Sequence, residues 1–103
     1  MNVDLSKKLL VTTPIFYPNA KPHLGHLFTS ILADTIKRIN QLKGVHTILS
    51  TGTDEHGIKM MKTAQAIGMK NVKTLCDINA EIFKEMMKNA NISYNVFTRT
   101  TEG

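Results

Sequence analysis

The stretch TTPIFYPNAKPHLGHLFTS, residues 12–30, decides the fold. It follows an apolar run over residues 7–13, crosses a loop punctuated by three prolines, and ends in two histidines around a glycine. An apolar-periodic segment begins at once after it. Branched apolar residues ended by proline are typical of a buried strand, and a three-to-four-residue apolar period is typical of a helix. The stretch is therefore predicted to be a strand, a loop and the start of a helix.

Outward from this stretch, strand and helix patterns alternate. The helix is predicted over residues 25–43, with one apolar face made by Leu27, Ile31, Leu32, Ile36, Ile39 and Leu42, and Gly44 as its stop signal. The remaining predicted elements are a strand at 45–51, a loop at 52–57, helices at 58–67 and 72–89, and a strand at 94–100.

The order β-α-β-α-α-β predicts an α/β fold with a parallel sheet, because crossover helices separate the strands. We expect the first half of a doubly wound, Rossmann-like nucleotide-binding domain. Three strands alone would leave bare sheet edges. Residues 1–103 are therefore expected to be the N-terminal portion of a catalytic domain whose remainder is absent.

Composition narrows the function only a little. The formal charge of +5 suits a polyanion such as ATP or RNA, but the lysines are scattered and no basic run marks a nucleic-acid surface. Cys76, the single cysteine, has no internal disulfide partner and is expected to be a small core residue. No segment approaches the roughly 18 apolar residues of a membrane span, and the first seven residues do not resemble a targeting peptide.

Two polar loops are expected to meet at one edge of the sheet, because ligands in open α/β folds bind beyond the carboxyl ends of the strands. The first loop carries His23, Gly25 and His26, and the second carries Asp54. A helix N-terminus favours an anion. The two histidines are three residues apart and share a helical face, so both could donate hydrogen bonds to a phosphate, more strongly when protonated.

Simpler roles remain open for these residues. A histidine near a helix start is often a surface or capping residue, Asp54 could be only a turn residue, and Tyr17 could be packed in its loop. A metal site built from the two histidines with His56, Asp54 and Glu55 is not expected, because the sequence has neither a second cysteine nor a His-Glu-x-x-His pattern.

At these motifs the sequence resembles the class I aminoacyl-tRNA synthetases, and within that class the methionine-specific family. PHLGH at 22–26 is similar to the HIGH motif of the class. TTPIFYPNAKPHLGH, LADTIKR, STGTDEHGIKM and FTRTTEG resemble blocks of the methionine family, so the similarity runs from Leu10 to Gly103. HLFTSILAD and STGTDEHG look most like the mitochondrial, bacterial-derived branch.

The resemblance implies a ligase that activates methionine with ATP to methionyl-adenylate and transfers it to methionine tRNA, with Mg²⁺ accompanying ATP. It assigns ATP binding to Asn19, His23, Gly25 and His26, the two histidines being catalytic. It assigns methionine binding to Ile15, Tyr17 and Asp54. Tyr17 offers an aromatic ring that suits a thioether, and Asp54 a carboxylate for the amino group.

The family's KMSKS motif and zinc knuckle do not occur in this stretch, and tRNA contacts would come from parts that are absent. We therefore expect the isolated 103 residues to be inactive. Two alternatives stay open: another HxGH nucleotidyltransferase, and a short non-catalytic product that associates with tRNA or with the enzyme. The sequence places the protein inside the cell, in the mitochondrial matrix or the cytoplasm, and leaves its oligomeric state undetermined.

Overall fold

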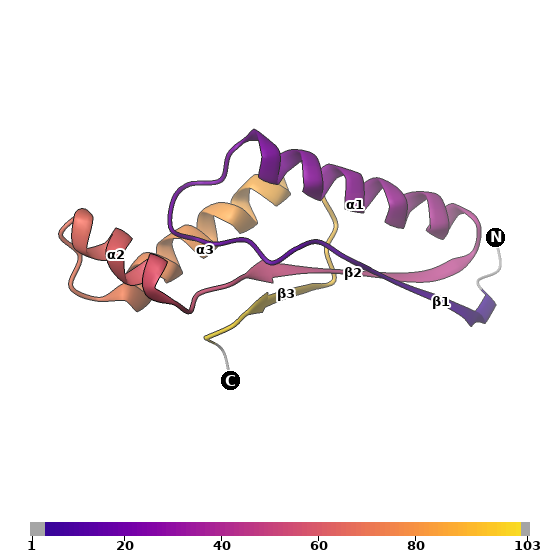
Figure 1. The fold of residues 1–103 in the computed structure, drawn as a ribbon. Coiled ribbons are helices and arrows are strands. Elements are labelled where there is room, and N and C mark those ends of the chain that lie inside the picture. The colour runs from indigo at the N-terminus through magenta and orange to yellow at the C-terminus, as the bar shows by residue number, and fades with distance from the viewer. Residues whose placement is uncertain (1–3, 102–103) are drawn as a thin grey trace.

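The computed structural model describes residues 4–101. The elements are β1 (Asp4–Thr12), α1 (Leu24–Leu42), β2 (Val45–Thr53), α2 (Ile58–Ala66), α3 (Val72–Asn89) and β3 (Val96–Arg99). Figure 1 shows a long, flat arrangement in which α1 and α3 lie on one side of the strands. The predicted order and the α/β fold class are confirmed.

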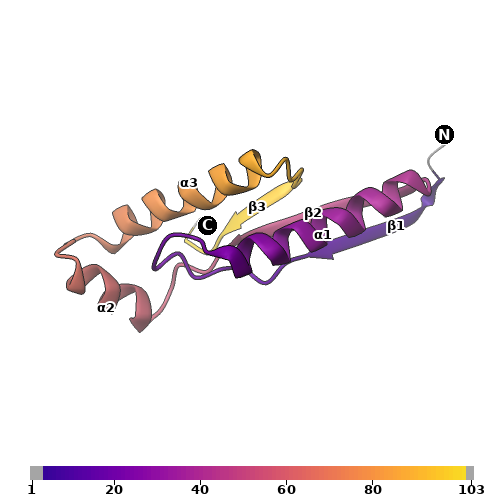
Figure 2. The same ribbon diagram turned by 90° about the horizontal axis from the view of Figure 1, so that it is seen from above.

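The sheet is parallel throughout, in the order β1-β2-β3. Leu10 of β1 pairs with Ile48 of β2, and Ser50 of β2 pairs with Val96 of β3. Seen from above in Figure 2, α1 runs over the β1–β2 pair, while α3 lies on the β3 side. Two crossovers between neighbouring parallel strands with helices on one side make half of a doubly wound sheet.

The bounds of all three strands differ from the prediction. β1 spans Asp4–Thr12, whereas residues 7–13 were expected. β2 runs on through Gly52 and Thr53, which were expected to be loop, and β3 is four residues long instead of seven. Gly52 stays in the strand because a Cβ there would lie 1.9 Å from the Thr98 carbonyl oxygen of β3, so only glycine allows the two strands to approach. Asn95 leaves the strand because its side-chain oxygen accepts a hydrogen bond from the Leu49 N–H (2.9 Å).

The core of the described residues has two parts. The larger cluster contains Phe16, Ala33, Leu49, Phe83, Met87 and Ile92. The smaller cluster joins α2 to α3 through Met60, Ala64, Leu75 and Cys76. Cys76 is buried, as the sequence predicted. In the part of the chain that is described, no helix is both long enough and apolar enough to cross a bilayer.

The side of α1 that is buried is not the apolar stripe. Ile31, Leu32, Ile36, Ile39 and Leu42 are all exposed, and of the predicted stripe only Leu27 packs against the core. The residues that α1 buries are Ser30, Ala33, Asp34 and Lys37. The periodicity correctly predicted a helix, but the implied core-facing side is wrong for the described residues.

The buried polar groups of α1 are satisfied by the loop between α3 and β3. The Asp34 carboxylate accepts a hydrogen bond from the Ser93 N–H (3.1 Å), and the Lys37 ammonium donates to the Ser93 carbonyl (2.5 Å). These hydrogen bonds offset the free-energy cost of removing the two polar groups from water. They hold the middle of α1 against the loop between α3 and β3.

Candidate active site

The predicted site loops lie at the same edge of the sheet. Because β1 and β2 pair in parallel, the loop after β1 and the turn after β2 both leave from carboxyl ends. Phe16 joins them: its N–H donates to the Gly52 carbonyl (2.9 Å), and its own carbonyl accepts from the Asp54 N–H (2.8 Å). The first loop is thereby extended along β2 up to Asp54.

His23 and His26 cap α1 themselves. His23 is the N-cap residue, in an extended conformation, and its Nδ1 accepts a hydrogen bond from the Gly25 N–H (3.0 Å). His26 Nδ1 accepts from the His23 N–H (3.0 Å), which completes a capping box. Two histidines thus do what Ser and Glu do in the usual motif. Sequence reasoning set the capping role against the functional role, whereas the structure leaves the outer ring nitrogens free of the cap.

The capping bonds determine the tautomer of both rings. A ring nitrogen that accepts a backbone N–H carries no proton, so neutral His23 and His26 carry their hydrogen on Nε2. The ring centroids are 3.9 Å apart. The helix N-terminus therefore presents two adjacent Nε2–H donors.

Aromatic packing favours the neutral form of His26. Phe16 and Phe83 both meet its ring edge to face, with centroid distances of 4.9 Å and 5.0 Å. Burial lowers the pKa of His26, and the nearby His23 lowers it further. The arrangement thus favours a neutral His26 as a donor, whereas sequence reasoning regarded protonated histidines as the stronger donors.

Gly25 is required by the histidine pair. A Cβ at this position would lie 2.8 Å from Cε1 of His23. Any side chain there would displace the His23 ring from its capping position. The resemblance assigned Gly25 to ATP binding, and the structure gives a reason for a glycine here that is internal to the protein.

The other predicted site residues lie in the loop after β1 and in the turn after β2. Ile15 and Tyr17 are exposed on either side of it, while Asn19 and Asp54 are half-buried. The Lys59 ammonium of α2 lies 5.2 Å from the centre of the Tyr17 ring, a cation–π distance. The Pro18 carbonyl accepts a hydrogen bond from the Asn79 side chain (2.7 Å), which ties this loop to α3.

Several residues that shape the site could not be identified from the sequence. Phe16 and Phe83 were not singled out, although their rings hold His26. Glu55 was considered only as a metal ligand, yet its carboxylate accepts hydrogen bonds from Arg99. Across residues 4–101, no group of three His, Cys, Asp or Glu side chains could hold a metal ion. The sequence showed an acidic pair in TDEHG. It gave no indication that Arg99, 44 positions after Glu55, would be the partner of that carboxylate.

Comparisons with known proteins agree on one family. The family model described as "tRNA synthetases class I (M)" matches residues 9–103. The methionine–tRNA ligase of Mycoplasma genitalium is 48% identical over 96 residues, which cover 93% of this chain and 19% of that protein. A probable mitochondrial methionine–tRNA ligase of Neurospora crassa is 47% identical over 97 residues, covering 94% of this chain and 15% of that protein.

A solved structure leads to the same result. Methionyl-tRNA synthetase of Mycobacterium tuberculosis in complex with methionyl-adenylate superposes with a TM-score of 0.91 at 41% identity. The match covers 94% of this chain and 19% of that one. The chain therefore spans less than a fifth of the length of each of these proteins.

Proposed function

The chain belongs to the methionine-type class I tRNA synthetases, and from that premise we propose that it forms the ATP and methionine half of the active site of such a ligase. Residues 1–103 would be the N-terminal portion of the catalytic domain. The full protein would activate methionine with ATP to methionyl-adenylate and pyrophosphate, and then transfer the methionyl group to methionine tRNA. The relatives include bacterial and mitochondrial proteins, which fits either the cytoplasm or the mitochondrial matrix.

The observation that carries this proposal is the histidine capping box. It offers two Nε2–H donors at the positive end of α1, beside the turn that carries Asp54. Donors in place before the reaction are suited to a phosphate on which charge develops, because no reorganisation is needed at that moment. The two histidines would contact ATP phosphate oxygens, with Asn19 and Gly25 along the nucleotide.

Methionine would lie against the neighbouring loop. Ile15 and Tyr17 would contact its side chain, since an aromatic ring and an aliphatic group suit a thioether. The Asp54 carboxylate would accept the ammonium group. An ammonium entering a partly dry site needs such a partner, because desolvating an unpaired charge is costly.

Mg²⁺ would accompany ATP. The described residues include no cluster of acidic or histidine side chains able to hold a metal ion by themselves, so the phosphates would supply its ligands. The contribution of this chain is then to bind and orient: neutral imidazoles at the phosphates, a carboxylate at the amino group.

Amino-acid-dependent ATP–pyrophosphate exchange tests the proposal, using the full-length polypeptide that carries this chain. Methionine alone among the twenty amino acids should support exchange. Exchange with a different amino acid, or exchange independent of any amino acid, would contradict the proposed substrate. The isolated 103 residues should show no exchange, and methionine-dependent turnover by them would refute the view that the site is incomplete.

A further inference from the structure

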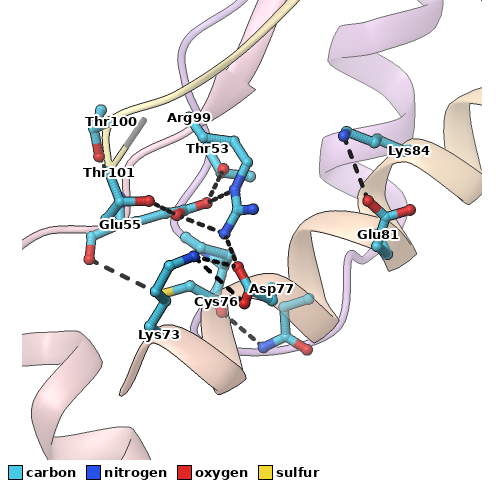
Figure 3. A network of polar contacts seen from close by, with 12 residues as sticks. Thr53, Glu55, Lys73, Cys76, Asp77, Glu81, Lys84, Arg99, Thr100 and Thr101 are labelled. Carbon is cyan, nitrogen blue, oxygen red and sulfur yellow. Dashed lines mark hydrogen bonds and ion pairs between the residues drawn. The ribbon is translucent and has the colours of Figure 1, made fainter. Parts of the chain in front are cut away.

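A network of buried polar side chains connects the carboxyl ends of β2 and β3 to α3 (Figure 3). Glu55 lies at its centre, with a side chain that is completely buried. Arg99 donates to both carboxylate oxygens, from Nε at 2.7 Å and from Nη2 at 2.9 Å. The hydroxyl groups of Thr53 (2.6 Å) and Thr101 donate to the same carboxylate. Both oxygens of Glu55 are therefore fully engaged inside the protein.

The network continues from Arg99 to the surface of α3. Arg99 Nη2 donates to Asp77 Oδ1 at 2.5 Å, and Lys73 donates to the same oxygen at 3.1 Å. Two carboxylates and two cations balance in formal charge. The guanidinium of Arg99 thus neutralises the negative charge of Glu55 inside the protein.

Stability alone does not explain an ion pair in this position. Removing two charges from water costs several kcal/mol per ion, and apolar residues of similar shape often serve as well or better. A bidentate pair does fix geometry, because the planar guanidinium accepts only a narrow range of carboxylate positions. The pair therefore holds one backbone segment in a fixed position.

That segment is the turn carrying Asp54. On one side, the Thr53 carbonyl accepts from the Thr100 N–H at 3.2 Å. On the other side, the Glu55 N–H donates to the Thr100 hydroxyl at 2.7 Å. The Asp54 N–H itself donates to the Phe16 carbonyl. Thr53 and Glu55 are buried, whereas Asp54 between them is only half-buried. Both neighbours of Asp54 are therefore anchored in the protein, while Asp54 itself stays partly accessible.

We propose that the Glu55–Arg99 pair is the positioning element of the amino acid site, which holds the Asp54 carboxylate where it receives the ammonium group of the substrate. The inference rests on the proposed function, since it takes Asp54 as the partner of that ammonium. Glu55 and Arg99 touch no substrate and act through Asp54. Because Arg99 neutralises Glu55, the adjacent Asp54 supplies the negative charge that the substrate meets.

The test compares Glu55→Gln and Arg99→Lys with wild type in the full-length polypeptide, by methionine-dependent ATP–pyrophosphate exchange. A displaced carboxylate should raise the KM for methionine about 10-fold or more, since small misplacements of a binding group can cost up to about 100-fold. The KM for ATP should stay within about twofold of wild type, because the histidine pair is held by other bonds. Equal changes in both KM values would overturn the proposal.

A matched control is Asp34→Asn. Asp34 is also a buried carboxylate, bonded to the Ser93 N–H and to Arg38, but it contacts the loop between α3 and β3. This variant should lower the melting temperature and leave the KM for methionine unchanged. If Asp34→Asn raised the methionine KM as much as Glu55→Gln does, the effect would be one of general stability and the proposal would be wrong.

A double variant guards against simple unfolding. Glu55→Gln with Arg99→Met removes both buried charges while keeping similar volumes, so it should fold at least as well as either single variant. Its KM for methionine should still be raised; a wild-type value would overturn the positioning role.

Asp54→Ala separates the two proposals. If it raises the KM while the Glu55 and Arg99 variants do not, only positioning fails, whereas no change in Asp54→Ala would defeat the Asp54 assignment itself.

Discussion

Replacing His26 by asparagine tests its helix-capping bond separately from its proposed bond to the substrate. The Nδ1 atom of His26 accepts the His23 N–H at 3.0 Å, and Nε2 points its hydrogen outward. An asparagine Oδ1 can take the place of Nδ1, since both atoms are bonded to Cγ. It reaches no further, so the outer donor is lost. Glutamine is long enough to place an N–H near the Nε2 position, and at this third position of the helix its oxygen can accept the His23 N–H, as in the usual capping box.

The expected effect on the reaction rate is larger than the expected effect on stability. A lost donor to a charge that develops in the transition state costs about 2–4 kcal/mol, which is on the order of 10- to 1000-fold in rate. A lost capping acceptor costs about 0.5–2 kcal/mol of stability, with the low end expected because this bond is exposed. His26→Asn should therefore keep the melting temperature and lose turnover. His26→Gln should also keep the melting temperature and should retain more turnover than His26→Asn.

The assays are ATP–pyrophosphate exchange and thermal unfolding by circular dichroism, both on the full-length polypeptide. In His26→Asn, turnover should fall much more than ATP binding weakens, because the interaction forms mainly in the transition state. Wild-type turnover in His26→Asn would show that His26 only caps the helix. A rate that tracked melting temperature across both variants would refute the separation of roles.

Three further predictions concern β2 and the turn after it. Gly52→Ala should cost about 3 kcal/mol of unfolding free energy, because the new methyl group would meet the Thr98 carbonyl of β3; Gly68→Ala, with φ +76° and open space, should cost only about 1–2 kcal/mol by chemical denaturation. Asp54→Asn should raise the KM for methionine about 10- to 100-fold by removing a charge-assisted bond, and an unchanged KM would exclude the amino-group role. Burial raises the pKa of Glu55, but hydrogen bonds from Arg99 and two threonines outweigh it and lower that pKa below its ordinary 4.5. The resulting stability is present above about pH 4.5 and is lost as the pH falls through the lowered pKa, so the melting temperatures of wild type and Glu55→Gln should converge as the pH is lowered below 4.5; a constant difference would contradict this.

Local chemistry made much of the fold predictable. Branched runs, apolar periods and caps such as Asn71 depend on neighbours within a few residues, and each of them marks an element that the structure contains. The HxGH spacing likewise predicted that His23 and His26 share a face, which their ring distance of 3.9 Å confirms. The proposed roles of the site residues stay predictions.

The sequence by itself determined the alternation of strands and helices and the pairing of the two histidines, because these follow from short-range steric and hydrogen-bonding rules. It also indicated a parallel sheet, because a helix lies between each pair of successive strands and crossover connections join parallel strands. Only the tertiary structure decided which face of α1 is buried and where Glu55 finds its charge partner. Asp34 meets Ser93 across 59 positions, and Glu55 meets Arg99 across 44. A pattern reports that a residue is polar, but the free energy of burying it depends on a partner that the chain brings near only when it folds.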